Sequence, residues 1–246
     1  MSCSAFDLAH LRRHLVQLEG PRRGRGALSL GDPTLDAALP WGGLPRGGLH
    51  DVVGSEEDAA AGGFAMALAG RLAGGTGRIL HVGLRRRRQT AGLPYGPGLV
   101  RLGIDPDRLI LAAAGRPVDL LWTMEEGLRS GALAVVIGEG VTADATASRR
   151  LQLAAEAGRA VALLLPTTET RSSVALTRWR IAAAPSPDGP CRPRWRVALE
   201  RCRGGSPGDW MVDWDDEAHR FVVVPLLADR RPALAAAHPR SRAGGE

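Results

Sequence analysis

The chain has 246 residues, 44% of them apolar, which is enough to form the core of one α/β domain with a smaller appended region. No run of about 18 apolar residues is present, and the N-terminus lacks an apolar secretory segment, so we expect a cytoplasmic protein without a membrane span. The formal net charge of +6 is compatible with nucleic acid or an acidic partner, and equally with a solvated basic surface.

The cysteine and arginine content gives two further expectations. Cys3, Cys191 and Cys202 are widely spaced without a C-x-x-C pair, which favours a reduced compartment and no zinc site. All 32 Lys and Arg residues are arginine, and asparagine is also absent. Both absences are typical of a very GC-rich genome, so arginine content alone is not a functional signal.

Residues 1–25 are predicted to form an amphipathic helix followed by a basic hinge. Apolar residues recur at helical spacing over Phe6–Leu18, and Gly20–Gly26 is rich in glycine and arginine. The helix could pack on the chain's own core or bind a partner, and the sequence leaves both roles open. His10 and His14 have i, i+4 spacing, but without nearby carboxylates or cysteines we expect no metal site there.

Residues 26–172 alternate between apolar strands and helices, which predicts a parallel α/β sheet. Between the second and third of these strands, Leu84–Thr90 is expected to be an arginine-rich connecting loop. The expected strands are Asp51–Val53, Ile79–Val82, Leu109–Ala112, Leu133–Ile137 and Ala160–Leu165. The expected helices are Pro33–Leu39, Ala59–Ala73, Leu99–Leu102, Val118–Ser130 and Ala147–Ala157.

Residues 173–227 change to β-rich segments separated by turn residues, which predicts an antiparallel, tryptophan-rich extension. Its expected strands are Val174–Ala184, Arg194–Arg203, Asp209–Trp214 and Arg220–Val224. Residues 228–246 are rich in proline, arginine and alanine, and we expect a disordered tail.

The loop after the first core strand has the position of a phosphate-binding loop without its residues. Such a loop reads G-x-x-x-x-G-K-[ST], whereas here the residues are Gly54, Ser55, Glu56, Glu57, Asp58, Ala59, Ala60 and Ala61. Alanine therefore stands where the second glycine, the lysine and the hydroxyl are expected. The three acidic residues would repel a polyphosphate, and Asp58 is expected to cap the following helix.

The segment LSLGDPTLDAALPWGGLPRGGLHDVVG, residues 28–54, resembles the entry to a RecA-type recombinase core. Two later segments are similar to the same family: LGIDPDRLIL (Leu102–Leu111) and SGALAVVIGE (Ser130–Glu139). The resemblance covers about residues 28–165. It implies a RecA-like, P-loop NTPase-type α/β core with a mostly parallel central sheet, to which the C-terminal antiparallel β extension is added.

Within that superfamily the sequence is most similar to the ImuA family of the bacterial inducible-mutagenesis cassette. The residues that carry this resemblance are Tyr95–Ala112, Ser148–Leu165 and Arg194–Phe221. The resemblance implies a role in SOS-induced translesion DNA synthesis. It also implies the partners ImuB and RecA, and the error-prone DNA polymerase III α-type subunit as a further candidate.

The sequence departs from an active recombinase at further positions. After the strand Ile79–Val82 the family's catalytic carboxylate is expected, but Gly83, Leu84 and Arg85 follow. The metal-linked aspartate position is Gly138, and we expect the neighbouring Glu139 to face the other side of the strand. We therefore predict a scaffold without a cofactor and without ATP hydrolysis. The alternative is weak nucleotide binding through backbone amides and nearby arginines.

Two groups of residues are candidate contacts for a partner or for DNA. The first is the run Arg85, Arg86, Arg87 and Arg88, which would contact phosphates or simply be solvated. The second comprises Trp195, Arg196, Trp210 and Trp214, which would form a partner groove or pack on the core. On the strand Arg194–Arg203, the residues Trp195, Val197 and Leu199 are expected to share one face.

Three functions follow as hypotheses. The first is a non-catalytic RecA-like adaptor, whose recombinase-like surface pairs with RecA and ImuB. The second is an ATP-dependent, DNA-binding recombinase-like enzyme. The third is a cell-division inhibitor resembling SulA that binds FtsZ, against which the long C-terminal region argues.

Overall fold

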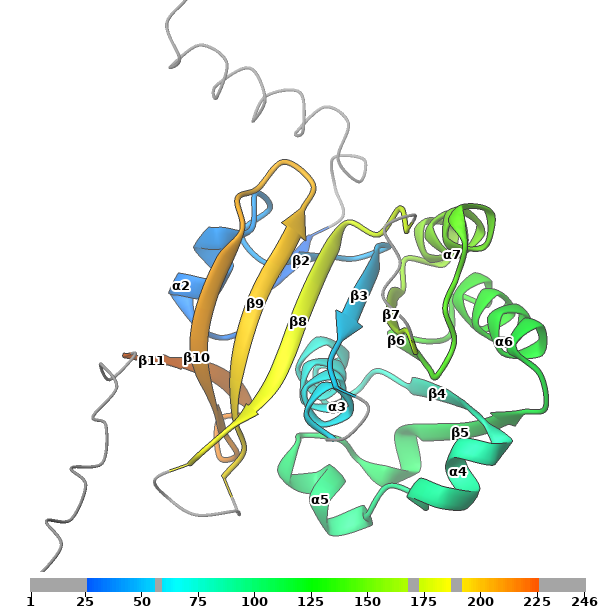
Figure 1. Cartoon of the computed structure of the whole chain (residues 1–246), viewed down its shortest axis with the longest axis horizontal. Coiled ribbons are helices and arrows are strands. Elements are labelled where there is room, and N and C mark those ends of the chain that lie inside the picture. The colour runs from blue at the N-terminus through cyan, green and yellow to red at the C-terminus, as the bar shows by residue number, and fades with distance from the viewer. Residues whose placement is uncertain (1–25, 56–58, 168–172, 187–191, 226–246) are drawn as a thin grey trace, which may run out of the picture.

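The computed structural model describes residues 26–55, 59–167, 173–186 and 192–225. Their strands form one sheet of nine strands in the order β11-β10-β9-β8-β3-β7-β6-β4-β5, and a separate pair, β1-β2 (Figure 1). The strands of the parallel half are β3 (Leu49–Val53), β4 (Ile79–Leu84), β5 (Leu109–Ala114), β6 (Val135–Glu139) and β7 (Val161–Leu165). The others are β1 (Ala27–Leu28), β2 (Leu44–Pro45), β8 (Thr177–Ala184), β9 (Arg194–Cys202), β10 (Gly208–Asp215) and β11 (Arg220–Val224).

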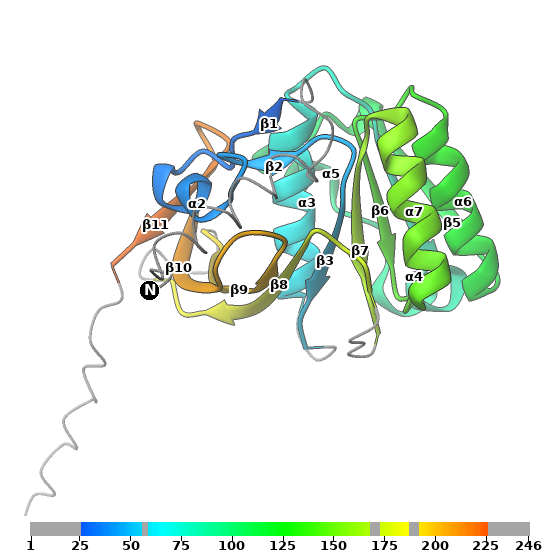
Figure 2. The same ribbon diagram turned by 90° about the horizontal axis from the view of Figure 1, so that it is seen from above.

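The helices cover the sheet from two sides. Helix α3 (Ala60–Ala73) lies on one side of β6 and β7, whereas α6 (Pro117–Arg129) and α7 (Ala145–Gly158) lie on the other (Figures 1 and 2). The shorter helices are α2 (Pro33–Ala38), α4 (Arg85–Ala91), α5 (Gly96–Arg101) and the 3-10 turn η1 (Pro106–Arg108). Two apolar cores result, one around α3 and one beneath α6 and α7.

The α/β class and the mostly parallel central sheet with added antiparallel strands are confirmed. Strands β3, β7, β6, β4 and β5 pair in parallel, as the alternation of strands and helices predicts. Strand β8 joins the two parts of the sheet, because it pairs in parallel with β3 and antiparallel with β9. Strands β8, β9, β10 and β11 form the expected antiparallel meander, so the β-rich region continues the core sheet directly.

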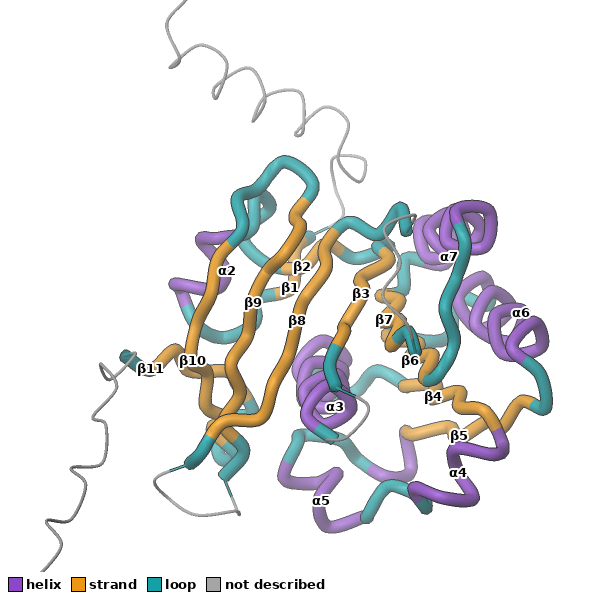
Figure 3. The backbone as a smooth tube through the Cα atoms, viewed as in Figure 1, coloured by secondary structure: helices purple, strands orange, loops and turns teal. Residues whose placement is uncertain are grey.

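The expected loop at residues 84–90 is instead helical, since α4 spans Arg85–Ala91 (Figure 3). Arginine and glutamine are good helix formers, so local propensity supports this helix where the arginine run suggested a loop. The N-terminal helix, the hinge and the tail from residue 228 lie outside the described residues. No helix in the described part of the chain is long and apolar enough to cross a membrane.

The aromatic residues of the β-rich region belong to the core on the α3 side. Trp195 and Phe221 both contact Phe64 of α3, with ring centroids 5.7 and 4.9 Å away. Trp214 packs against Phe221 at 5.0 Å. Trp195, Val197 and Leu199 share one buried face of β9, as the alternation of that strand predicts. Strands β9–β11 are therefore part of the hydrophobic core.

Candidate functional site

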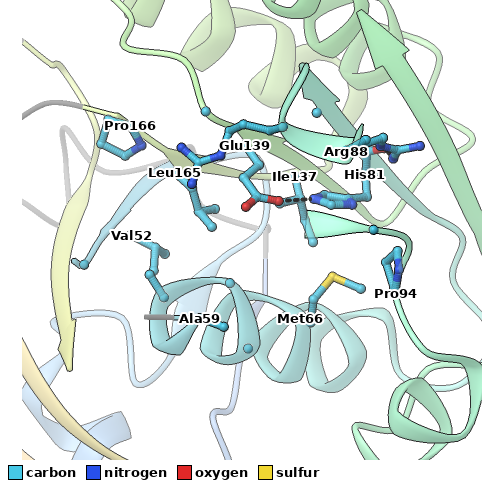
Figure 4. A pocket seen from close by; sticks show the side chains of 18 of the residues that line it. Val52, Ala59, Met66, His81, Arg88, Pro94, Ile137, Glu139, Leu165 and Pro166 are labelled. Carbon is cyan, nitrogen blue, oxygen red and sulfur yellow. Dashed lines mark hydrogen bonds and ion pairs between the residues drawn. The ribbon is translucent and has the colours of Figure 1, made fainter. Parts of the chain in front are cut away.

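A cavity of about 260 Å³ opens at the carboxyl ends of four parallel strands (Figure 4). Its walls come from the ends of β3, β4, β6 and β7, the first turn of α3, and the segment from α4 to Pro94. Open α/β sheets bind ligands at this edge, because loops and helix N-termini converge there. We call it the carboxyl-end pocket.

The loop between β3 and α3 packs tightly beside this pocket. A Cβ atom added to Gly54 would lie only 2.7 Å from the Ala61 Cβ, so the loop requires a residue without a side chain there. Helix α3 begins after Ala59, which makes no side-chain capping bond, so Ala59 rather than the expected Asp58 holds the cap position. Ser55 is exposed, while Glu56, Glu57 and Asp58 lie outside the described residues.

Alanine side chains occupy the positions where a phosphate-binding loop has its reactive groups. Ala60, at the lysine position, is only 7% exposed, and Ala61, at the hydroxyl position, lines the pocket. Methyl groups there can neither neutralise phosphate charge nor hold Mg²⁺. The backbone N–H groups of the first turn of α3 can donate hydrogen bonds to an anion.

Glu139 points into the carboxyl-end pocket, which corrects the expectation from the sequence. A side chain on Gly138 would instead collide with Met124 of α6, on the opposite face of the sheet. In the pocket, Glu139 Oε2 lies 3.0 Å from His81 Nε2 (Figure 4). Since a carboxylate only accepts hydrogen bonds, His81 Nε2 carries the proton. One acidic group is thus retained where we expected none.

Two arginines of α4 turn toward the same edge. Arg88 donates from Nη2 to the His81 carbonyl oxygen at 3.1 Å, and Arg87 lies against Gly140. The His81 hydrogen bond is the main reason that the pKa of Glu139 is lowered, with Arg87 and Arg88 adding attraction against the cost of burial. Burial also lowers the pKa of Arg88. The charge of the Glu139 carboxylate is therefore offset within the pocket by Arg87 and Arg88.

Known proteins of similar sequence match most of the length of this chain. No protein-family model matches the sequence. The chain is 37% identical to Protein ImuA of Caulobacter vibrioides strain NA1000 / CB15N, over 90% of this chain and 98% of that protein. Protein ImuA of strain ATCC 19089 / CIP 103742 / CB 15 gives the same values.

The chain belongs to the ImuA family. Because the match covers nearly the full length of both chains, membership in the ImuA family rests on more than the three sequence blocks that resembled it. These ImuA relatives bear no activity in their names, so the chemistry of the pocket has to be argued from its own residues.

In this ImuA-family chain, the residues proposed as contacts have different environments. Arg85 and Arg86 are exposed on α4, whereas Arg87 and Arg88 are half-buried at the carboxyl-end pocket. Trp195 and Trp214 are buried and serve the core, which agrees with the packing interpretation. Trp210 is half-buried, and the exposed Arg196 forms an ion pair of 2.7 Å with Asp209. The structure does not gather these residues into one site.

A second, apolar groove adjoins the carboxyl-end pocket. It has a volume of about 310 Å³ and shares Gly63, Met66 and Pro94 with the pocket. Tyr95 on its rim is 75% exposed, and the neighbouring Leu93 is 69% exposed. Arg101 and Asp216 form an ion pair of 2.7 Å at the other side. Of the predicted contacts, Trp214 lines this groove, whereas its other residues and His81 were not predicted because residues distant in the chain create both sites. We call it the apolar groove.

Among the described residues, the cysteine and the histidines give no second centre of reactivity. Burial raises the pKa of the Cys202 thiol to about 11, so it stays protonated at neutral pH. Within residues 26–55, 59–167, 173–186 and 192–225, no three His, Cys, Asp or Glu side chains are grouped as a metal ion would need. Cys3, Cys191, His10 and His14 lie outside these residues.

Proposed function

We propose that this chain is a non-catalytic, RecA-like adaptor in SOS-induced translesion DNA synthesis. It would act in the mutagenesis cassette by binding ImuB and RecA, and the error-prone DNA polymerase III α-type subunit is a further candidate partner. One observation carries the proposal: an ImuA-family chain has a pocket at the carboxyl edge of a parallel sheet, and the loop beside it has alanines at the positions where a phosphate-binding loop would have its lysine and hydroxyl.

The RecA-like part of the proposal is supported by where the pocket lies. Strand β3 is central in the sheet, and its loop leads directly into α3. Phosphate-binding folds have this strand–loop–helix arrangement. We infer that the chain has a recombinase-type scaffold, and that its outer surface pairs with a RecA subunit or with the end of a RecA filament.

The absence of catalysis is supported by chemistry at the pocket. Ala60 and Ala61 supply neither the ammonium group nor the hydroxyl that phosphoryl transfer uses. Glu139 is the one observation that favours the alternative, an ATP-dependent DNA-binding enzyme, because a carboxylate at a strand end can orient metal or water. In this chain His81 and the arginines of α4 already engage that carboxylate.

The apolar groove is the surface that we propose for a protein partner. Tyr95 lines it and is 75% exposed, and Leu93, which lines the adjoining carboxyl-end pocket, is 69% exposed. Clustered exposed apolar side chains mark interaction sites, and tyrosine is enriched among residues that dominate binding energy. Tyr95 therefore takes the place of Trp195 as the proposed anchor, since Trp195 is buried in the core, while the buried Trp214 forms part of the groove wall.

Co-purification with ImuB and with RecA tests the adaptor role. We expect the tagged full-length chain to retain both proteins, and the double variant Leu93→Ala/Tyr95→Ala to lose at least one of them. Leu153→Ala is the matched control, because Leu153 is 47% exposed on α7 and does not line the groove. Truncation before Arg194 is unsuitable, since it removes core strands. Failure of the unaltered chain to retain either protein would contradict the proposal.

A further inference from the structure

Acidic neighbours neutralise many of the arginines in the described part of the chain. Examples are the pairs Arg101–Asp216, Arg116–Asp119, Arg150–Glu125, Arg194–Asp213 and Arg196–Asp209, with nitrogen–oxygen distances of 2.5–2.8 Å. Because every Lys or Arg residue of this sequence is arginine, the number of arginines does not indicate a binding site. A cluster of arginines that the fold leaves without acidic partners carries more information, because unbalanced positive charge is costly to gather unless an anion offsets it.

One concave site gathers three arginines from two separate elements. It has a volume of about 340 Å³ and is lined by Arg149, Gln152, Val174, Ala175, Arg201 and Arg203. Arg149 lies in the N-terminal half of α7, while Arg201 lies at the end of β9 and Arg203 directly follows that strand. Val174 and Ala175 precede β8, which pairs with the start of β3, so the site lies at the opposite end of β3 from the carboxyl-end pocket. We call it the arginine groove.

The three guanidinium groups of the arginine groove have few partners of their own. Among the described residues, the side chains of Arg149 and Arg203 have no ion-pair partner, and both are exposed. Arg201 donates from Nη2 to the Ala175 carbonyl oxygen at 3.3 Å, and its buried Nε has no hydrogen-bond partner in the part of the chain that the structure describes. Donors therefore remain for a ligand.

The nearby carboxylates are engaged elsewhere or partly neutralised. Glu200 pairs with Arg178 at 3.5 Å and with Arg180, and Glu156 accepts from the Gln152 amide at 2.9 Å. Asp51 is buried, and that burial raises its pKa, although Arg178 and Arg201 attract its charged form. As far as the structure describes its surroundings, the arginine groove is consequently positive overall.

We propose that the arginine groove binds a phosphate group. The planar guanidinium fork matches phosphate oxygens with two parallel hydrogen bonds. Three positive charges around a single small concavity suit the concentrated charge of a phosphate better than the spaced carboxylates of an acidic peptide. The phosphate could come from a nucleic-acid backbone or from a small phosphorylated molecule, and both would use the same arginines. This site is independent of the adaptor role proposed above.

The test measures binding of a fluorescent oligo-dT strand to the full-length chain by anisotropy at several salt concentrations. For single strands, each phosphate that the protein neutralises steepens the slope of log K against log[salt] by about 0.7. We expect the slope to be shallower by about 1.4 in the double variant Arg149→Gln/Arg203→Gln. Arg116→Gln is the matched control, because Arg116 is exposed but paired with Asp119, and it should leave the slope unchanged.

Two competitors distinguish the source of the ligand. Inorganic pyrophosphate tests a small phosphate, and poly-glutamate tests an acidic peptide. Arginine-dependent binding of oligo-dT assigns the site to a nucleic-acid backbone, whereas arginine-dependent binding of pyrophosphate alone assigns it to a small phosphate. The proposal is overturned if the double variant binds both phosphate probes as the unaltered chain does, if the unaltered chain binds neither, or if poly-glutamate binds more tightly through the same arginines.

Discussion

His50 is fully buried in β3, where its Nδ1 lies 2.7 Å from Thr177 Oγ1. The same hydroxyl oxygen accepts a hydrogen bond of 2.7 Å from Trp179 Nε1, so the Thr177 hydroxyl proton is left for His50 Nδ1. A neutral imidazole suits this arrangement. Burial lowers the pKa of His50 from 6.5 to about 3, because a charged ring would be desolvated in the core.

Acid should therefore destabilise the protein through His50. Since the folded pKa lies below the unfolded value of 6.5, this contribution to stability is complete above pH 6.5 and is lost as pH falls toward 3. The expected slope is about 1.4 kcal/mol per pH unit. Urea denaturation at pH 7, 6 and 5 measures it, and His50→Gln should flatten the slope. An equal slope in both proteins would show that His50 does not carry the effect.

At the carboxyl-end pocket, the sequence did not predict correctly which face of the sheet each residue of β6 points to. The run of apolar residues in β6 predicts a buried strand but does not tell which of Gly138 and Glu139 faces α3, because both sheet faces are covered. Pairing with β4 settles it, since Gly83 lies opposite Glu139 and both line the pocket. The alanines at positions 60 and 61, in contrast, are given by the sequence itself, and the absence of ATP hydrolysis that we infer from them stays a prediction.

At the scale of elements, the edge strand β11 is held by the chain segment that precedes α2. On β11, the N–H of Phe221 donates to the Leu30 carbonyl oxygen at 3.2 Å, and the N–H of Val223 donates to Asp32 Oδ2 at 2.9 Å. Asp32 also accepts from the Thr34 N–H at 2.8 Å, which caps α2. One carboxylate thus joins the segment before α2 to the last strand, and protects that strand edge.

Asp32→Ala should cost about 2 kcal/mol of unfolding free energy, because it removes a helix cap and leaves a strand N–H without its acceptor. Asp144→Ala is the matched control: Asp144 caps α7 through the Ala147 N–H at 2.7 Å, and no second element depends on it. We expect the control to lose about 1 kcal/mol. Equal losses in urea denaturation would argue against a dual role for Asp32.

Most elements and the parallel class of the core sheet could be predicted from the sequence, whereas the strand order and the junction between the two parts of the sheet could not. Periodicity located β9 and α6 to within a few residues, since buried strands and amphipathic helices leave strong local patterns. The parallel pairing of β8 with β3 depends on residues about 125 apart, and no local pattern encodes it. The loop predicted for the arginine run was wrong, because the charge of these residues indicates exposure to solvent and does not determine the backbone conformation.

At the scale of the whole molecule, the β-rich region is inseparable from the core. Trp195 of β9 and Phe221 of β11 pack on Phe64 of α3, so removing the last strands would expose the centre of one apolar core. Any function of this region must therefore be tested with surface substitutions. The two proposed binding surfaces, the apolar groove and the arginine groove, lie at separate places on this single scaffold.

The proposed adaptor role requires that this scaffold does not bind and cleave a triphosphate. Phosphate release from ATP with Mg²⁺, measured with and without single-stranded DNA, is the decisive assay. We predict no release above the buffer rate in either condition, and no difference between the unaltered chain and Glu139→Ala. Release that single-stranded DNA stimulates and Glu139→Ala abolishes would contradict the claim.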